Sequence, residues 1–338
     1  MIKKSKVIRQ LPGFDSPPLT DGGFTLIELM ISLVISMVII GAIYGSYISQ
    51  QRSFVAQDQV AEMNSTSKIA LDMIVNDIRE TGFGLPDAGT YNINGFTNFI
   101  AAINSTTAAD QITLLGGFRR AGTLCSNSAG EVISPSDTQL ILRRPADSSQ
   151  WIINNGESAD ISFGGISFAV ITVGPGTGAS ATITILNAIG KGFPKYTDIN
   201  ENGLCDDREG VPVYLVEDNT YRVVDTQLQR VRRLNGASPE IDVIAENIED
   251  FQIAYGYDTD NNGIIDPATE FVNAPPATDR LLRIRLNLLA RTARADPNYQ
   301  EQGNPPDKIE DREHDETTKD SLKRRLWQME VALRNTIL

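Results

Sequence analysis

The sequence predicts an α+β protein in which one long N-terminal helix packs against an elaborated antiparallel β-sheet. Three observations support this prediction. A long apolar stretch follows the first 23 residues, no Gly or Pro occurs from Gln50 to Arg79, and beyond Gly84 short runs rich in Val, Ile, Leu and Thr alternate with turn residues. The first two patterns are typical of a continuous helix, and the third is typical of strands joined by turns.

The acidic composition argues against nucleic acid as a binding partner. The chain has 338 residues, of which 41% are hydrophobic and 22% charged, as in an ordinary folded protein. Thirty basic residues against 43 acidic ones leave a net charge of −13. Because such a chain is repelled by phosphate backbones, nucleic acid is not expected as a partner.

Residues 1–23 differ in character from everything that follows them. Lys3, Lys4, Lys6 and Arg9 give a cationic start, and several prolines together with the Gly22-Gly23 pair oppose a helix. We therefore expect residues 1–23 to be a cytoplasmic leader that is removed.

Residues 24–81 are predicted to form one helix whose first half spans a membrane. No formal charge occurs from 29 to 48, and 20 helical residues extend roughly 30 Å, the thickness of a bilayer core. The excess of Lys and Arg before this span should keep the leader cytoplasmic. An ordinary cleaved signal peptide is disfavoured, because no small-residue cleavage site follows and because Glu28 lies within the apolar run.

The junction Gly23-Phe24-Thr25-Leu26-Ile27-Glu28 resembles the cleavage and methylation motif of type IV prepilins and type II secretion pseudopilins. The resemblance implies that a prepilin peptidase cuts between Gly23 and Phe24 and methylates the new amino group of Phe24. It also implies that Glu28 meets the N-terminal amine of a neighbouring subunit during assembly. A glycine before the cut suits an extended backbone in a protease cleft.

The second half of the helix should contact the globular domain. Leu71, Ile74, Val75 and Ile78 recur at helical spacing and predict one buried face. Thr81-Gly82 predicts the end of the helix. The Gly41–Gly45 pair is consistent either with a helix-packing face or with small residues in a span.

Residues 82–338 are predicted to form one β-rich globular domain. The expected strands are 111–115, 138–143, 161–173, 181–186, 211–216, 221–225, 228–234, 251–257, 281–289 and 327–333. A short helix is expected at 242–250. Residues 295–320 are polar and proline-containing and predict a loop, in which the single histidine, His314, should be solvated.

Three later segments narrow the resemblance. They are DIRETGFG at 77–84, ENIEDFQIAYGYD at 246–258 and VALRN at 331–335. Together they resemble the PilW family of minor pilins, whose relatives in secretion systems are the J-type pseudopilins. Membership would imply a role in priming or capping a pilus, with the major pilin, other minor pilins and a tip adhesin as partners.

Two acidic loops have the spacing of calcium sites. The first matches D-x-[DN]-x-[DN]-G-x5-E in full and offers Asp198, Asn200, Asn202, the Leu204 carbonyl, Asp206 and Glu209. The second offers Asp258, Asp260, Asn262, the Ile264 carbonyl and Asp266, but the residue in the twelfth position is Thr269 and Glu270 comes one residue late. Hard oxygen ligands at alternate positions suit Ca²⁺, although turns with solvated acids give the same pattern.

The redox state of the two cysteines depends on the compartment in which the domain folds. If the domain is exported, a disulfide between Cys125 and Cys205 is expected, whereas two free thiols are expected in the cytosol.

The sequence therefore predicts a minor pilin of a type IV pilus that acts by assembly and not by catalysis. We expect it to be anchored in the inner membrane by a single span, with a periplasmic domain, and then to enter an extracellular pilus. The sequence contains no P-loop, no G-x-S-x-G and no zinc spacing. A type II secretion pseudopilin and a membrane-anchored calcium-binding adhesin outside any filament remain the alternatives.

Overall fold

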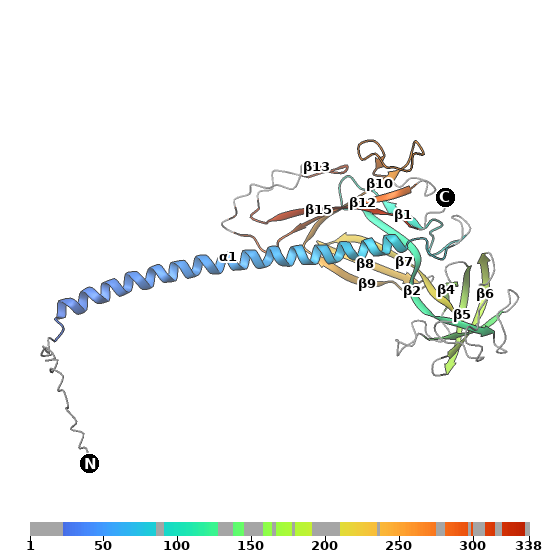
Figure 1. Cartoon of the computed structure of the whole chain (residues 1–338), viewed down its shortest axis with the longest axis horizontal. Helices are drawn as coiled ribbons and strands as arrows, with labels where there is room; N and C mark the ends of the chain where they lie inside the picture. The colour runs from blue at the N-terminus through green and yellow to red at the C-terminus, as the bar shows by residue number, and fades with distance from the viewer. Residues whose placement is uncertain are drawn as a thin grey trace, which may run out of the picture. The chain divides into compact units, whose positions relative to one another are not determined.

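The computed structural model confirms the α+β class (Figure 1). It describes residues 23–85, 91–127, 138–144, 158–163, 167–177, 180–190, 210–234, 237–274, 281–296, 299, 308–314 and 320–334. The chain divides into two compact units, residues 1–55 and 56–338. The helix α1, Leu26–Glu80, contributes to both of them, and each unit is described by itself below.

The second half of α1 packs one face against the sheets. Its buried residues are Met63, Ser67, Ala70, Leu71, Ile74, Val75 and Ile78, which follow the helical spacing of the sequence. The helix ends at Glu80, and Gly82 adopts a left-handed backbone with φ 77°. The N–H of Gly82 donates to the carbonyl of Leu115 at 2.8 Å, so the helix end is bonded to the sheet. A Cβ at Gly116 would lie 2.9 Å from the Glu80 carbonyl oxygen, and this close approach requires glycine.

The larger sheet has nine strands in the order β1-β2-β3-β6-β5-β4-β7-β8-β9, with β2 also paired to β7. All of the pairings are antiparallel. Its strands are β1 (Ile100–Ile103), β2 (Gln111–Asn127), β3 (Gln139–Arg143), β4 (Ser158–Phe163), β5 (Ser167–Thr177), β6 (Ser180–Gly190), β7 (Val211–Val224), β8 (Gln227–Leu234) and β9 (Glu240–Glu246).

A second sheet and a small hairpin complete the fold. The four-stranded sheet has the order β11-β10-β12-β15, and the hairpin pairs β13 with β14. Their strands are β10 (Ile248–Tyr257), β11 (Phe271–Val272), β12 (Leu281–Arg291), β13 (Lys308–Ile309), β14 (Arg312–Glu313) and β15 (Arg324–Ala332).

The main core lies between α1 and both sheets. Helix residues such as Leu71 and Ile74 pack in one buried cluster with Tyr221 of β7, Phe251 of β10 and Leu286 of β12. A separate buried cluster is formed by β2, β3, β4, β6 and β7 without the helix. The extension of the sheet through β3–β6 therefore has a core of its own.

Four sequence-based predictions about elements are corrected. The helix expected at 242–250 is wrong, because this segment forms the end of β9 and the start of β10 around Asn247, whose φ is 60°. The strand expected at 161–173 is two strands, β4 and β5, and those expected at 211–216 and 221–225 are one strand, β7. Within 295–320, residues 308–313 form the β13–β14 hairpin and are not simply a loop.

Candidate functional sites: the N-terminal helix and an acidic loop

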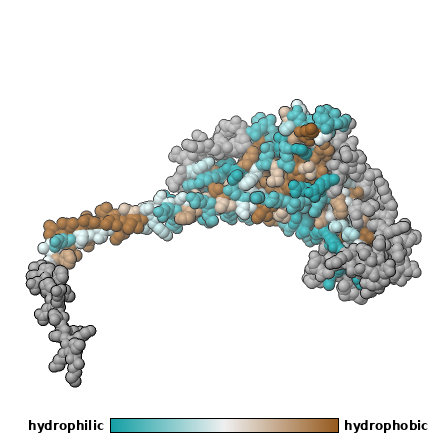
Figure 2. Space-filling model, viewed as in Figure 1, coloured by the Kyte–Doolittle hydropathy of each residue, from teal (hydrophilic) through white to brown (hydrophobic). Residues whose placement is uncertain are grey.

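The first part of α1 exposes an unbroken apolar surface. Large side chains from Phe24, which is 87% exposed, to Tyr47, 59% exposed, lie open around the whole helix. Figure 2 shows this part of the helix as largely hydrophobic. The helix is long and apolar enough to cross a membrane, and none of its most apolar window is buried. An apolar surface of this size requires lipid or other protein chains to cover it.

Thr25 and Glu28 close the start of α1 as a capping box. The N–H of Thr25 donates to Glu28 Oε2 at 2.9 Å, and the Thr25 hydroxyl donates to the same oxygen at 3.0 Å. The N–H of Glu28 lies 3.4 Å from the Thr25 hydroxyl oxygen. This reciprocal arrangement satisfies donors that every helix N-terminus leaves free. In the absence of a second subunit, therefore, Glu28 already has a partner within its own chain.

Three glycines in this region have no packing role within the described chain. A Cβ placed at Gly23, Gly41 or Gly45 would meet nothing within 4 Å. At Gly23 the absence of a steric reason within the chain is consistent with recognition by a peptidase. At Gly41 and Gly45 it is consistent with close approach of a second helix.

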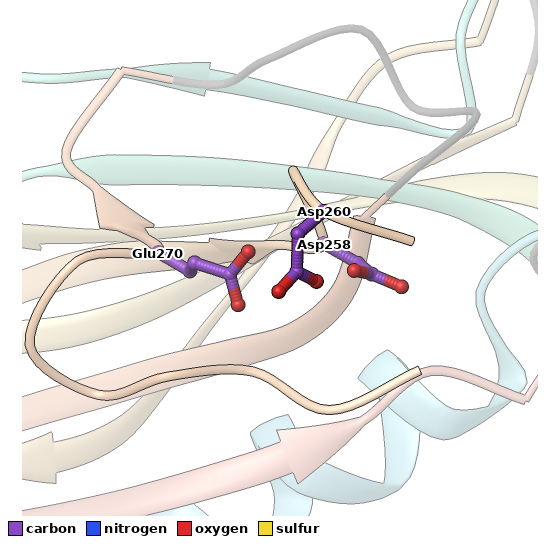
Figure 3. Close-up of side chains that lie close together, drawn as sticks. All are labelled: Asp258, Asp260 and Glu270. Atoms are coloured by element: carbon purple, nitrogen blue, oxygen red, sulfur yellow. The ribbon is translucent and has the colours of Figure 1, made fainter. Parts of the chain in front are cut away.

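The second acidic loop joins β10 to β11 and brings three carboxylates together (Figure 3). One carboxylate oxygen from each of Asp258, Asp260 and Glu270 lies within 4.8 Å of the other two. Asp258 and Glu270 are buried, and Asp260 is exposed. Glu270, which the sequence motif placed one residue late, therefore belongs to the cluster.

Backbone donors hold this loop in shape. The N–H groups of Asn262 and Gly263 donate to Asp258 at 3.1 and 2.9 Å. The Asp266 N–H and the Thr259 hydroxyl donate to Glu270 at 2.9 and 2.7 Å, and these bonds hold the pKa of Glu270 below its usual range.

The other predicted ligands of this loop bond within it. Asn262 accepts from the N–H of Ile264 at 2.6 Å. The Asp266 carboxylate accepts from the Ala268 N–H at 3.0 Å and from the Thr269 hydroxyl at 2.9 Å. Fewer side chains therefore come together in this loop than the calcium-ligand spacing of the sequence predicted.

Two predicted sites lie wholly or partly outside the described residues. The first acidic loop, with Asp198, Asn200, Asn202, Leu204, Asp206 and Glu209, is outside them. Cys125 lies in β2, whereas Cys205 is outside the described residues. The first calcium loop and the disulfide therefore stay predictions.

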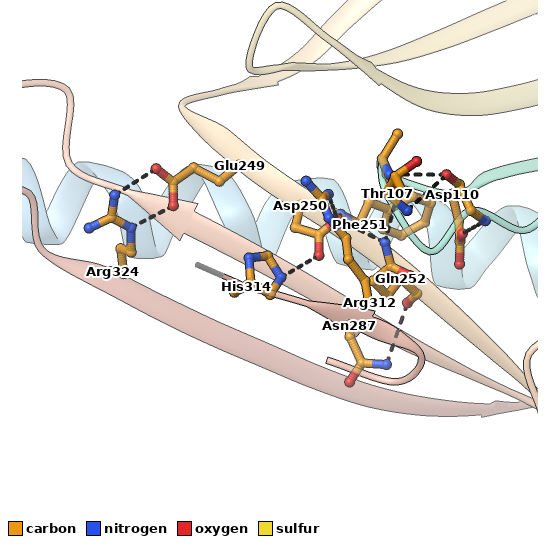
Figure 4. Close-up of polar contacts among 12 residues, drawn as sticks. Thr107, Asp110, Glu249, Asp250, Phe251, Gln252, Asn287, Arg312, His314 and Arg324 are labelled. Carbon is orange, nitrogen blue, oxygen red and sulfur yellow. Dashed lines mark hydrogen bonds and ion pairs between the residues drawn. The ribbon is translucent and has the colours of Figure 1, made fainter. Parts of the chain in front are cut away.

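A buried polar cluster on β10 was not predicted (Figure 4). Asp250 is fully buried and accepts a hydrogen bond from the Arg312 guanidinium of the β13–β14 hairpin. His314 Nε2 lies 2.8 Å from the other Asp250 oxygen, and the His314 side chain is only 12% exposed. The expectation that His314 is solvated is therefore wrong, because the hairpin folds back onto β10 and buries it.

Comparison with known proteins gives two family matches. Residues 20–44 match the prokaryotic N-terminal methylation motif, and residues 213–335 match type IV pilus-assembly protein W, the PilW family. No curated protein sequence matches the chain. A type IV-like pilin from Thermus thermophilus aligns over 82% of this chain and 97% of its own length, with 12% identity and a TM-score of 0.35.

The two sequence matches concern different parts of one chain. The first covers the capping box and the exposed apolar stretch, and the second begins in β7 and runs through the helix-facing strands to the end of β15. The first match names N-terminal methylation and the second names type IV pilus assembly, as the sequence motifs predicted. The two matches support a type IV pilin-like minor pilin whose residues 213–335 form a PilW domain.

Proposed function

We propose that this chain primes or caps a type IV pilus near its tip, by inserting its N-terminal helix among those of other pilins. The exposed apolar surface from Phe24 to Tyr47 carries the proposal. The span makes almost no contact within its own chain, so its cover must come first from the inner membrane and then from other subunits. The cationic leader sets the orientation, with residues 82–338 on the periplasmic side.

Glu28 gives the proposed assembly its specificity. A carboxylate within a lipid-covered helix is costly unless it finds a partner. The Thr25 N–H and hydroxyl already provide a partial partner. A cationic amine on the processed Phe24 of a neighbouring subunit would provide a stronger one, because bonds between charged groups are roughly twice as strong as neutral ones.

Substitution can separate the capping role of Glu28 within its own helix from its proposed charge pairing with a neighbouring subunit. Glutamine also serves in a capping box, so Glu28→Gln should keep the helix start while it removes the charge, and Glu28→Ala removes both. We expect both variants to insert into the membrane but to be recovered in sheared pili at a small fraction of the wild-type amount. Asp58→Asn, which neutralises an exposed acid further along α1, is the matched control. Wild-type recovery of Glu28→Gln would contradict the charge-pairing role.

A deletion strain discriminates the pilus from the alternatives. Loss of surface pili with intact protein secretion favours the pilus, and the reverse favours a type II secretion pseudopilin. An anchored adhesin outside any filament would leave both unchanged.

A second proposed property is that Ca²⁺ stabilises the domain through the acidic loops. The observation that supports it is the convergence of Asp258, Asp260 and Glu270, which offers three hard oxygen ligands on one side of a tight loop. Without a cation these carboxylates repel one another. The first loop offers more ligands by sequence, so it should bind more tightly than the second.

Thermal melting of the full chain in detergent tests this property. Millimolar Ca²⁺ should raise the melting temperature relative to chelator, since a ligand at a hundredfold excess over Kd stabilises by about 2.7 kcal/mol. Glu209→Ala should remove much of the shift and Glu270→Gln a smaller part, while Asp72→Asn on the exposed side of α1 should leave it intact. An unchanged wild-type melting temperature would reduce both loops to ordinary turns.

A further inference from the structure

The second acidic loop carries an Asn-Gly pair, Asn262-Gly263, at its exposed turn. Both residues are open to solvent. Gly263 has a left-handed backbone with φ 78°, and a Cβ placed on it would meet nothing of the described chain within 4 Å. Because glycine has no Cβ to block the approach, its backbone nitrogen can come close to the side-chain amide of the residue before it. The pair therefore has the sequence and the open space that attack by a backbone nitrogen on an asparagine amide requires.

Asp258 lies where such a reaction needs a base (Figure 3). The N–H of Gly263 donates to Asp258 Oδ2 at 2.9 Å, which is within the reach of about 3 Å that a general base needs. The other carboxylate oxygen of Asp258 accepts the N–H of Asn262 at 3.1 Å, so the carboxylate is held in place. A carboxylate on this hydrogen can remove the proton while the Gly263 nitrogen forms its new bond.

Hydrogen bonds also hold both ends of the Asn262 amide. Asn262 Oδ1 accepts the N–H of Ile264 at 2.6 Å, and Asn262 Nδ2 donates to Asp260 Oδ2 at 2.7 Å. The first bond stabilises the negative charge that develops on Oδ1 when a nucleophile adds to Cγ, as the donors of an oxyanion hole do. The second bond holds the nitrogen that must leave. The loop thus places a nucleophile, a base and an oxyanion donor around one amide.

We propose that Asn262 is a self-modifying site that deamidates in the folded chain, with Asp258 as the base. The Gly263 nitrogen attacks Asn262 Cγ and gives its proton to Asp258, which passes the proton through solvent to the leaving nitrogen. The Cγ–Nδ2 bond breaks, and ammonia departs from a cyclic succinimide. Water then opens the ring and leaves aspartate or isoaspartate at position 262. The reaction adds one negative charge to the loop and needs only water, so it does not depend on calcium or on pilus assembly.

A second Asn-Gly pair among the described residues, Asn94-Gly95, is an internal control. Gly95 also has a positive φ, 91°, and open space at its Cβ position. Its N–H, however, donates to the side-chain amide oxygen of Asn92 at 2.9 Å. An amide oxygen is a far weaker base than a carboxylate, so this pair shares the sequence of Asn262-Gly263 but lacks the base.

Peptide mass spectrometry of the full-length chain, incubated in detergent with chelator at neutral pH, tests the proposal. The conversion of amide to acid is followed with time at Asn262 and at Asn94. In the folded chain Asn262 should convert about tenfold faster than Asn94, and about tenfold faster than Asn262 itself in the chain unfolded by denaturant. Conversion at Asn262 that is no faster in the folded chain than in the unfolded one would overturn the proposal, because the hydrogen bonds would then protect the amide.

Substitution tests the base. Asp258→Asn keeps an oxygen acceptor for the Gly263 N–H but removes the carboxylate, and it should slow conversion at Asn262 about tenfold. Asp266→Asn removes the same charge from a residue of this loop that contacts Ala268 and Thr269, and it should leave the rate unchanged. Equal slowing in the two variants would also overturn the proposal. Unchanged conversion at Asn94 shows that a variant is folded, and the comparison of folded with unfolded wild type decides the matter without any variant.

Discussion

At the scale of single residues, Asp110 is a buried carboxyl group whose protonation is shifted by folding. It accepts the backbone N–H groups of Ser105 and Ile253, both at 2.8 Å. Burial nevertheless raises its pKa to about 6, and the nearby carboxylates of Asp311 and Asp250 act in the same direction. In the folded chain the proton on Asp110 is therefore held to a higher pH than in the unfolded chain.

This shift gives a pH prediction with a defined sign. Because the folded pKa lies above the unfolded one, the contribution of Asp110 to stability is present below about pH 4 and is lost as the pH rises through 6. The Asp110→Asn variant lacks this pH-dependent contribution, because an amide does not titrate. Its free energy of unfolding, measured relative to wild type, should therefore rise between pH 4 and pH 7. A difference between the two proteins that does not change with pH would contradict the shift.

The Asp250 cluster shows what the sequence could not reveal about single residues. Arg312 and His314 lie more than 60 residues after Asp250 in a polar, proline-containing segment, and nothing in their spacing marks them as buried. Only the return of the β13–β14 hairpin over β10 and β12 brings them together. Glu310, in the same hairpin, accepts from Asn287 of β12 at 2.8 Å. Long-range polar contacts of this kind leave no periodic pattern in a sequence.

At the scale of elements, the helix could be predicted and several strands could not. The buried face of α1 and its end near Thr81 follow from local periodicity and from glycine chemistry. A helix was wrongly predicted at 242–250 because Ala245, Glu246 and Glu249 favour helix in isolation. In the fold, pairing with β8 and the left-handed Asn247 override that propensity. Strand lengths such as that of β7 depend on partners distant in the sequence.

The disulfide predicted between Cys125 and Cys205 stays untested, and the pairing of β2 with β7 is compatible with it. Val211 at the start of β7 lies opposite Leu124, the neighbour of Cys125. Cys205 precedes Val211 by only six residues, which span at most about 20 Å. If the bond forms, Cys125→Ser should lower stability by up to about 4 kcal/mol. A thiol assay on the unfolded, exported protein should find no free thiol, and two free thiols would refute the bond.

At the scale of the whole molecule, one chain combines a helix with an exposed apolar first half and strands that match the PilW family model. The two family matches cover residues 20–44 and 213–335, whereas the extension formed by β3–β6 lies outside both. That extension has its own buried cluster and does not contribute to the core around α1. A substitution in this extension is therefore expected to leave the helix-to-sheet contact intact.

The central claim is that this chain is processed and assembled as a pilin, and the N-terminus of the mature protein tests it most directly. Mass spectrometry of the exported protein should find N-methylated Phe24 as the first residue, because Gly23-Phe24 lies immediately before the exposed apolar stretch of α1. An intact leader, or a new terminus after residue 45, would contradict the claim.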